Sequence, residues 1–94
     1  MEDEIHLFPI VQATNAIFPD LYLRQTCLFF IEQGAKRVVD VDRKEWLAEE
    51  GDLLIFPPDS IVTMENRPKM EVDYRAMGIA YSSCLLYTSD AADE

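Results

Sequence analysis

Few side chains in this chain of 94 residues have the types and spacing that catalysis requires. The single histidine, His6, lies near the start of the chain, where a lone histidine is more often a surface residue than a ligand. Cys27 could act as a nucleophile, but no histidine is close in sequence to activate it, which favours a small buried thiol. Glu49 and Glu50 could form an acid pair, yet consecutive residues of a strand or turn point apart. These residues therefore favour a binding or structural protein over an enzyme.

Short apolar runs separated by turn residues indicate how the chain is organised. In the clearest stretch, Gly51 opens a turn, residues 53–56 form an apolar strand that stops at Pro57, and residues 61–64 form a second strand. Further strand candidates are residues 5–13, 21–23, 26–33, 36–41, 44–47 and 74–81. Turn signals spaced roughly every 8–12 residues predict a β-sandwich or barrel, and no helical period is sustained.

Composition excludes several classes of function. The formal charge of −10, from 18 acidic and 8 basic residues, leaves no basic footprint, so this segment is a poor candidate for nucleic-acid binding. The acidity itself indicates a solvated surface. The two cysteines make no disulfide framework, the acidic start is unlike a signal peptide, and no run is long enough to span a membrane. We therefore expect a single cytoplasmic domain without membrane contact. Trp46 is expected to anchor the packing of its strand.

Residues 84–94 resemble translated sequencing-adaptor DNA rather than natural protein. The alternative is a genuine strand over residues 85–88 with a polar tail. Under the adaptor interpretation, the natural gene is expected to continue beyond this point. The regulatory domain then comprises residues 1–83 and is truncated at its C-terminus.

The spacing of the central stretch resembles the second sequence motif of cupins, which are small double-stranded β-helix barrels of the jelly-roll group. Gly51, Pro57 and Asn66 occupy positions of that motif. Asp59 stands where the family has glycine, and Val62 stands where it has a metal-binding histidine. The resemblance implies an all-β fold, a cupin-like jelly-roll barrel.

The same resemblance bears on metal binding. In the first cupin motif, Cys27 stands at the position of the metal-binding glutamate. The two histidine positions fall on Leu21 and Leu23, or on Asp20 and Tyr22 if the spacing is one residue longer. Enzymic cupins hold a divalent metal with three histidines and a carboxylate. With Val62 at the remaining position, we expect no metal, no cofactor and no catalysis of the cupin kind.

A longer resemblance extends from Leu28 to Tyr81. The segments 28–34, 49–58 and 74–81 are similar to the N-terminal domain of AraC-type bacterial transcription regulators. In that family the domain binds a small-molecule effector or mediates dimerisation, and a C-terminal pair of helix-turn-helix motifs binds DNA. The resemblance implies an effector-sensing domain that forms a homodimer and contacts DNA only through a domain missing from this fragment.

Two other interpretations stay open. One is a stand-alone small cupin enzyme that modifies a sugar or another small molecule, a relative of isomerases or dioxygenases. The other is a cupin that acts as a binding or structural module without catalysis. A stop codon soon after Tyr81 in the natural gene would exclude the regulator.

The cupin resemblance also implies which side chains line an effector pocket. The motif position of Val62 points into the barrel, and by strand alternation Met64 should do so too. Because Cys27 stands in for an inward glutamate, Phe29 and Ile31 should line the same side. A packed apolar core without a cavity is the alternative.

The orientation of Arg75 is left open by the sequence. If it points inward, it could orient an anionic effector by bidentate pairing. If it lies at the rim, it could pair with Asp73 or Glu71. An unpaired buried charge is costly, which favours the rim.

Overall fold

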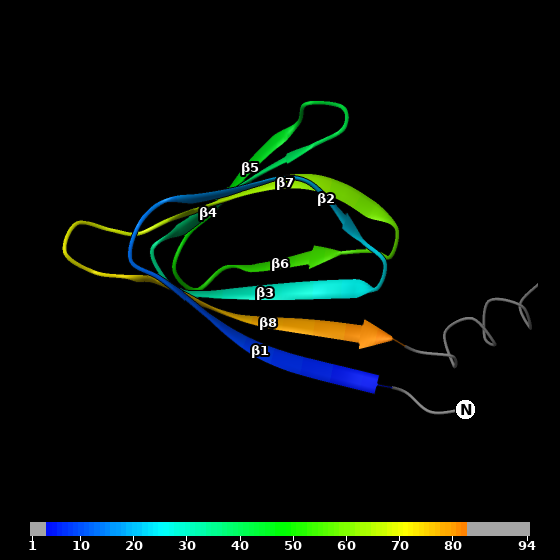
Figure 1. Ribbon diagram of the computed structural model, residues 1–94, viewed down its shortest axis with the longest axis horizontal. Coiled ribbons are helices and arrows are strands. Elements are labelled where there is room, and N and C mark those ends of the chain that lie inside the picture. Colours follow the sequence, from blue (N-terminus) through cyan, green and yellow to red (C-terminus); the bar gives the residue numbers. More distant parts are fainter. Residues whose placement is uncertain (1–3, 83–94) are drawn as a thin grey trace, which may run out of the picture.

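The computed structural model describes residues 4–82, and these residues form strands but no helix. The strands are β1 (Glu4–Gln12), β2 (Ala16–Leu23), β3 (Thr26–Gln33), β4 (Ala35–Asp40), β5 (Glu45–Ala48), β6 (Leu53–Phe56), β7 (Ser60–Arg67) and β8 (Tyr74–Ser82). They build two antiparallel four-stranded sheets (Figure 1). We call β1-β8-β3-β6 the first sheet and β2-β7-β4-β5 the second sheet. The all-β prediction is confirmed.

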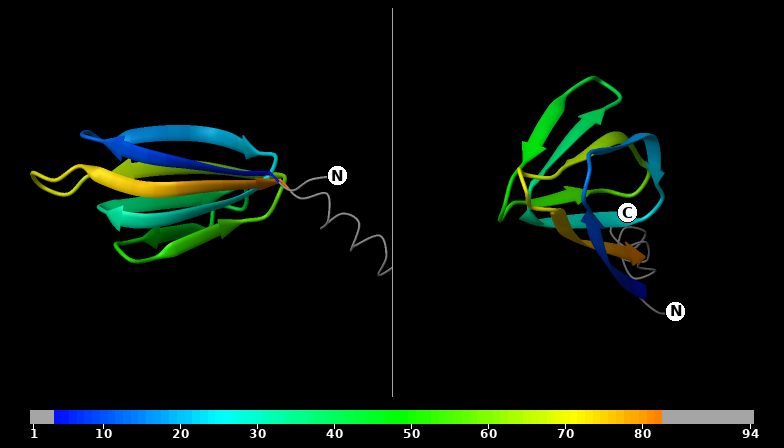
Figure 2. Two further views of the ribbon diagram at one scale, coloured as in Figure 1. Left: turned by 90° about the horizontal axis from the view of Figure 1, so that it is seen from below. Right: turned by 60° about the vertical axis from the view of Figure 1, so that its left-hand side comes forward.

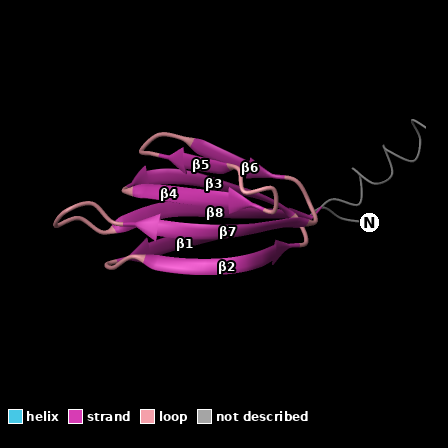
Figure 3. Cartoon of the chain, turned by 90° about the horizontal axis from the view of Figure 1, so that it is seen from above, coloured by secondary structure: helices cyan, strands magenta, loops and turns pink. Residues whose placement is uncertain are grey.

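The two sheets lie face to face (Figure 1 and the right panel of Figure 2), so that one overlies the other in the view from above (Figure 3). The buried apolar residues lie between them. Burial alternates along the central strands because successive side chains of a strand point to opposite faces. On β3, for example, Cys27, Phe29 and Ile31 are buried, and Leu28 and Phe30 lie on the other face. The core contains buried residues from β3, β4, β5, β6, β7 and β8.

A close approach between two neighbouring strands fixes the packing of the first sheet. Phe8 of β1 pairs with Gly78 of β8, and a Cβ atom on Gly78 would lie 2.2 Å from Cε2 of Phe8. The Phe8 ring covers this glycine and meets Phe29 edge-on, with 6.2 Å between centroids. Phe29 meets Phe56 in the same way at 5.8 Å. The absence of a side chain at residue 78 therefore allows an aromatic row to cross the core.

Two glycines with positive φ make the turns that reverse the chain. Gly34 (φ 88°) joins β3 to β4, and a Cβ atom there would lie 2.6 Å from the carbonyl oxygen of Arg67. Gly51 (φ 91°) precedes β6, and its N–H donates to the carbonyl of Ile31 at 2.8 Å. The turn predicted at Gly51 is confirmed.

The outer faces of the two sheets differ in chemistry. On the second sheet, Arg37 pairs with Glu45 at 2.7 Å, and Arg67 pairs with Glu65 at 2.9 Å. Arg37 also lies 3.8 Å from Glu65, so these charges form one connected group. Such a face is compatible with water.

The outer face of the first sheet is apolar across all four of its strands. Strand register places Leu7, Ile79, Leu28 and Ile55 in one row, and Pro9, Met77, Phe30 and Leu53 in the next. Leu7 and Ile55 are more than half exposed. An exposed apolar patch of this kind often marks an interaction site.

The expectation that Trp46 anchors packing is wrong. Its side chain is 47% exposed. The reason is that β5 is a short edge strand from which only Ala48 is buried. The prediction of an adaptor-derived tail over residues 84–94 lies outside the described residues.

Candidate functional site

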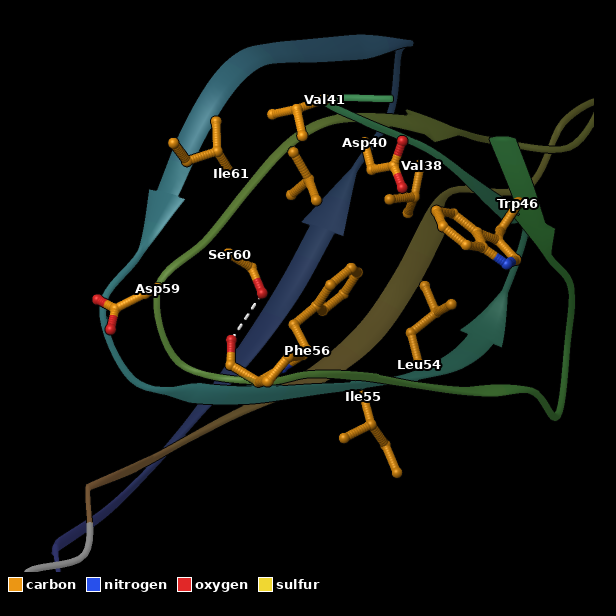
Figure 4. A pocket seen from close by; sticks show the side chains of 12 residues that line it. Val38, Asp40, Val41, Trp46, Leu54, Ile55, Phe56, Asp59, Ser60 and Ile61 are labelled. Atoms are coloured by element: carbon orange, nitrogen blue, oxygen red, sulfur yellow. Dashed lines mark hydrogen bonds between the residues drawn. The ribbon is translucent and has the colours of Figure 1, made fainter. Parts of the chain in front are cut away.

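A pocket of about 530 Å³ lies between the two sheets at one end of the structure (Figure 4). The turn between β6 and β7 closes one side, and the turn after β4 closes another. Its apolar walls are formed by Val38, Trp46, Leu54, Phe56 and Val62. Small-molecule sites are typically concave and mostly apolar, with volumes of roughly 300–1,000 Å³. The pocket therefore has the size and lining of a ligand site.

Strand pairing brings the residues of this pocket together. Val38 of β4 lies opposite Trp46 of β5, and Asp40 of β4 lies opposite Val62 of β7. Directly opposed residues on one face have Cβ atoms about 5 Å apart. The second sheet thus presents the Trp46 ring and the Asp40 carboxylate as diagonal neighbours on one face, beside Val38 and Val62.

Asp40 has a structural role at the rim. Its Oδ1 atom accepts the N–H groups of Asp42 and Lys44, each at 2.9 Å, which stabilises the turn after β4. Arg43 has a positive φ of 67° in this turn. Among the described residues, Oδ2 of Asp40 takes part in no hydrogen bond, although Asp40 is partly buried. One carboxylate oxygen therefore remains available to a ligand.

The turn between β6 and β7 supplies the other polar groups. Asp59 has φ 65°, and its carboxylate accepts the hydroxyl of Tyr22 at 2.5 Å. Ser60 Oγ donates to the carbonyl of Pro57 at 2.7 Å, which fixes the turn (Figure 4). The two charged residues that line the pocket, Asp40 and Asp59, are both acidic.

A second polar cluster, missed by the sequence analysis, is buried inside the barrel. Lys36 of β4 is 1% exposed, and its Nζ donates to Oδ1 of Asn66 at 2.6 Å and to the Tyr74 hydroxyl at 3.5 Å. Asn66 in turn donates to Oε1 of Gln12 at 2.6 Å. The ammonium lies 4.6 Å from the centroid of the Phe29 ring. We call these five residues the lysine cluster.

The electrostatics of the lysine cluster follow from its burial. No ion pair among the described residues includes Lys36, so hydrogen bonds and aromatic faces are what stabilise its charge. Burial away from water lowers the pKa of Lys36 from 10.5 to about 8. It likewise raises the pKa of Tyr74 from 10.0 to about 12.

The lysine cluster and the pocket occupy different parts of the same two strands. Lys36 lies opposite Asn66, whereas Asp40 lies opposite Val62, and the pair Val38 and Met64 lies between. A ligand in the pocket therefore meets Val38 and Val62 before it could approach the buried ammonium.

The four apolar residues predicted to point inward do so. Phe29, Ile31, Val62 and Met64 are all at most 6% exposed. Of these, only Val62 lines the pocket, and the others belong to the packed core. Whether they bind an effector stays a prediction.

Arg75 does not join them. The inner face of β8 carries Tyr74, Ala76 and Gly78, so Arg75 is exposed on the outer face of the first sheet. None of the ion pairs among the described residues includes it, so neither Asp73 nor Glu71 is its partner.

The positions that correspond to cupin metal ligands belong to the core or pack against it, but they have little ligand character. Leu21 pairs with Val62 across β2 and β7, and Leu23 packs against the same core. Cys27 is buried, and loss of hydration raises the pKa of its thiol. Across the described part of the chain, no three His, Cys, Asp or Glu residues group in a way that could hold a metal ion.

The paired sheets and their interior pocket define a cupin-like ligand-binding domain. The chain belongs to the family of AraC-like ligand binding domains, whose sequence pattern matches residues 10–92. Within residues 4–82 there is no helix long and apolar enough to cross a membrane.

Solved structures confirm the cupin-like fold. The chain superposes on a protein of unknown function from Rhizobium leguminosarum with a TM-score of 0.71 and 14% identity, covering 84% of this chain and 71% of that one. For a cupin 2 conserved barrel domain protein from Salinispora arenicola, the TM-score is 0.68 and the sequence identity is 13%. The match covers 96% of this chain and 72% of that one. For a cupin-like protein from Thermotoga maritima, the TM-score is 0.65 and the sequence identity is 12%. The match covers 81% of this chain and 56% of that one, so the chain spans little more than half of that protein. A search of curated proteins finds no match.

Proposed function

We propose that this chain is the effector-sensing domain of an AraC-type transcription regulator, that it works in the cytoplasm, and that a separate helix-turn-helix domain of the same protein contacts DNA. The observation that carries the proposal is the pocket of about 530 Å³ between the sheets of a domain from this ligand-binding family. Its walls combine apolar side chains with a few fixed polar groups, the combination that orients a small molecule.

The lining of the pocket supports binding rather than catalysis. It contains no cysteine, histidine or lysine, and the hydroxyl of Ser60 has no histidine or lysine in the lining to activate it. The candidate nucleophile Cys27 lies in the core instead, and its raised pKa disfavours the reactive thiolate. A stand-alone cupin enzyme is therefore the weaker alternative.

The position of the pocket suggests how an effector would be sensed. Trp46 lies on β5 of the second sheet, whereas Leu54 and Phe56 lie on β6 of the first sheet. Both β5 and β6 are short edge strands, and residues 49–52 join them. A ligand that contacts both edges would stabilise the arrangement in which they lie close together. The ligand can shift the protein toward that arrangement only by as much as it binds it more tightly than an arrangement in which the two edges lie further apart.

Filling the pocket should test this function. In the full-length regulator, Val62→Trp is expected to abolish the effector response while folding and basal DNA binding persist, because the indole would occupy the ligand space. Val39→Trp is a matched control, since Val39 neighbours Asp40 but lies on the opposite face of β4. An effector response that is unchanged in Val62→Trp would show that the pocket is not the sensing site.

We also propose that the domain forms a homodimer through the apolar outer face of the first sheet. This face is about 19 Å wide, given strands about 4.8 Å apart, and about 20 Å long from Ile5 to Val11. Its charged groups, Arg75 and Glu32, lie at one end, on the neighbouring strands β8 and β3. A two-fold axis along the strands between β8 and β3 would lay Arg75 of one copy against Glu32 of the other, in both directions. This self-complementarity favours a second copy as the occupant.

Sedimentation of the full-length protein tests the interface. Ile79→Glu should shift the protein to monomer, because it would bury a charge at the centre of the face. Thr63→Glu adds the same charge to the outer face of the second sheet and should leave the dimer intact. A dimer that survives Ile79→Glu would place the interface elsewhere, and a monomeric wild type would refute the homodimer.

A further inference from the structure

We infer that the effector is an organic cation, an ammonium group on an apolar body, whose charge is held by Asp40 and Trp46. This inference rests on the proposed effector-binding function, since it names the chemical class that the same pocket accepts. It is carried by the charge, the geometry and the aromatic lining of the pocket.

The charges around the pocket are of one sign. The lining includes Asp40 and Asp59 but no lysine or arginine. The whole chain carries a formal charge of −10, which adds a field of the same sign. A carboxylate or phosphate ligand would meet the Asp40 carboxylate without a cation to pair with, whereas an ammonium would be attracted.

Of the two carboxylates, Asp40 is the better placed to bind a cation in the pocket. Asp59 is exposed and already accepts the Tyr22 hydroxyl, whereas Asp40 is partly buried and lies beside Val62. The two N–H groups that bind Oδ1 of Asp40 hold the carboxylate in place before a ligand arrives. Because its surroundings are partly desolvated, an ion pair at Oδ2 is less screened than one at the surface.

Trp46 completes the site for a cation. Its ring lines the pocket from the same sheet as Asp40, and about half of it is exposed (Figure 4). Indole offers the strongest cation–π attraction of the aromatic side chains. An exposed indole beside a carboxylate suits a ligand that is positively charged at one end, while Val38, Leu54 and Phe56 can cover an apolar body.

The buried ammonium of Lys36 does not change this assignment. It is not part of the pocket lining, and its hydrogen bonds go to Asn66 and Tyr74 on the far side of Val38 and Met64. A ligand in the pocket is therefore closer to the charge of Asp40.

Three probes with one phenyl body can test the ligand class: benzyltrimethylammonium, benzyl alcohol and phenylacetate. Trp46 is the single tryptophan of the chain and supplies the fluorescence signal. We expect benzyltrimethylammonium to bind at least about tenfold more tightly than benzyl alcohol, which corresponds to about 1.4 kcal/mol, and phenylacetate to bind most weakly.

The variant that isolates the charge is Asp40→Asn, because an asparagine oxygen can still accept the turn N–H groups. It should weaken benzyltrimethylammonium binding about tenfold and leave benzyl alcohol binding unchanged. Asp42→Asn removes one charge from the same turn without touching the pocket and should change neither affinity. Calorimetry on Trp46→Leu should show weaker binding of the cation as well.

The outcomes separate the ligand class from the proposed function. Tighter binding of benzyl alcohol or phenylacetate, or an Asp40→Asn variant that binds the cation normally, would overturn the cationic class and leave the ligand-binding function in place. If none of the three probes binds at millimolar concentration, both the ligand class and the pocket as the sensing site are overturned.

Discussion

Replacing Lys36 by methionine should change how the stability of this domain depends on pH. Methionine keeps most of the volume of the side chain and removes the buried ammonium. In the wild type, burial lowers the pKa of Lys36 from 10.5 to about 8. Between these two pH values the unfolded state holds more protons than the folded state, so the free energy of unfolding rises as pH rises. Below pH 8, Lys36 is protonated in both the folded and the unfolded protein, and the cost of burying its charge is fully present.

The two pKa values set the magnitude of this effect. At about 1.36 kcal/mol per pKa unit, the buried charge costs the folded state about 3 kcal/mol at neutral pH. Between pH 7 and pH 9.5, about 2 kcal/mol of that cost should disappear. The raised pKa values of Cys27 and Tyr74 act in the opposite direction at higher pH, because these folded groups keep their protons longer. Both proteins contain Cys27 and Tyr74, so these two contributions largely cancel when the free energy of unfolding of Lys36→Met is subtracted from that of the wild type.

Urea denaturation of both proteins at a series of pH values from 7 to 9.5 measures this difference. The wild type should gain about 2 kcal/mol relative to Lys36→Met across the series. At pH 7 the variant also loses the hydrogen bond that the ammonium donates to Asn66, so the measured quantity is the change across the pH series and not the difference at one pH. Parallel pH profiles for the two proteins would refute the assignment of a lowered pKa to Lys36.

Two further predictions concern packing in the interior. Gly78→Ala should lower the free energy of unfolding by about 1–3 kcal/mol, because its Cβ atom would overlap the Phe8 ring, and Phe8→Leu should recover part of the loss in a double-mutant cycle. An additive cycle would contradict this contact. Asn66→Ala should destabilise the domain by about 1.5–3 kcal/mol, because the buried ammonium loses its 2.6 Å acceptor, and the loss should shrink in a Lys36→Met background. Equal losses in both backgrounds, measured by chemical denaturation, would show that the two side chains are not coupled.

The parts of the fold that could be predicted from sequence were those with a clear alternation of apolar residues. The cupin resemblance, extended by strand alternation, placed Phe29 and Ile31 on the inner face of β3, and Val62 and Met64 on that of β7, and burial confirms all four. The cupin-like fold predicted from turn spacing and from the motif around Gly51 is also confirmed.

The features that the sequence left open have a common physical origin, which is that contacts between residues remote in sequence decide where these side chains lie. Lys36 lies on the inner face of β4 with Val38, and only partners remote in sequence, Asn66 and Tyr74, make its burial tolerable. The Phe8 ring leaves no room for a Cβ atom at residue 78, which places Gly78 on the inner face of β8, and strand alternation then sends Arg75 outward.

Asp40 and Trp46 showed no sequence signal. One looks like an ordinary turn aspartate and the other like a core anchor. Their role at the pocket depends on which strand ends lie at the rim.

The lysine cluster has a consequence for how this chain folds. Its hydrogen bonds join residues that are far apart in sequence: Asn66 and Gln12 are separated by 54 residues, Lys36 and Tyr74 by 38, and Lys36 and Asn66 by 30. Contacts of such separation require long loops to close first, which slows folding. The ammonium gains its acceptors only after β4, β7 and β8 have met, so the cluster should form late, after the rate-limiting step. Substitutions within it should then accelerate unfolding while leaving the folding rate nearly unchanged, so these side chains would govern how long the domain stays folded rather than how quickly it folds.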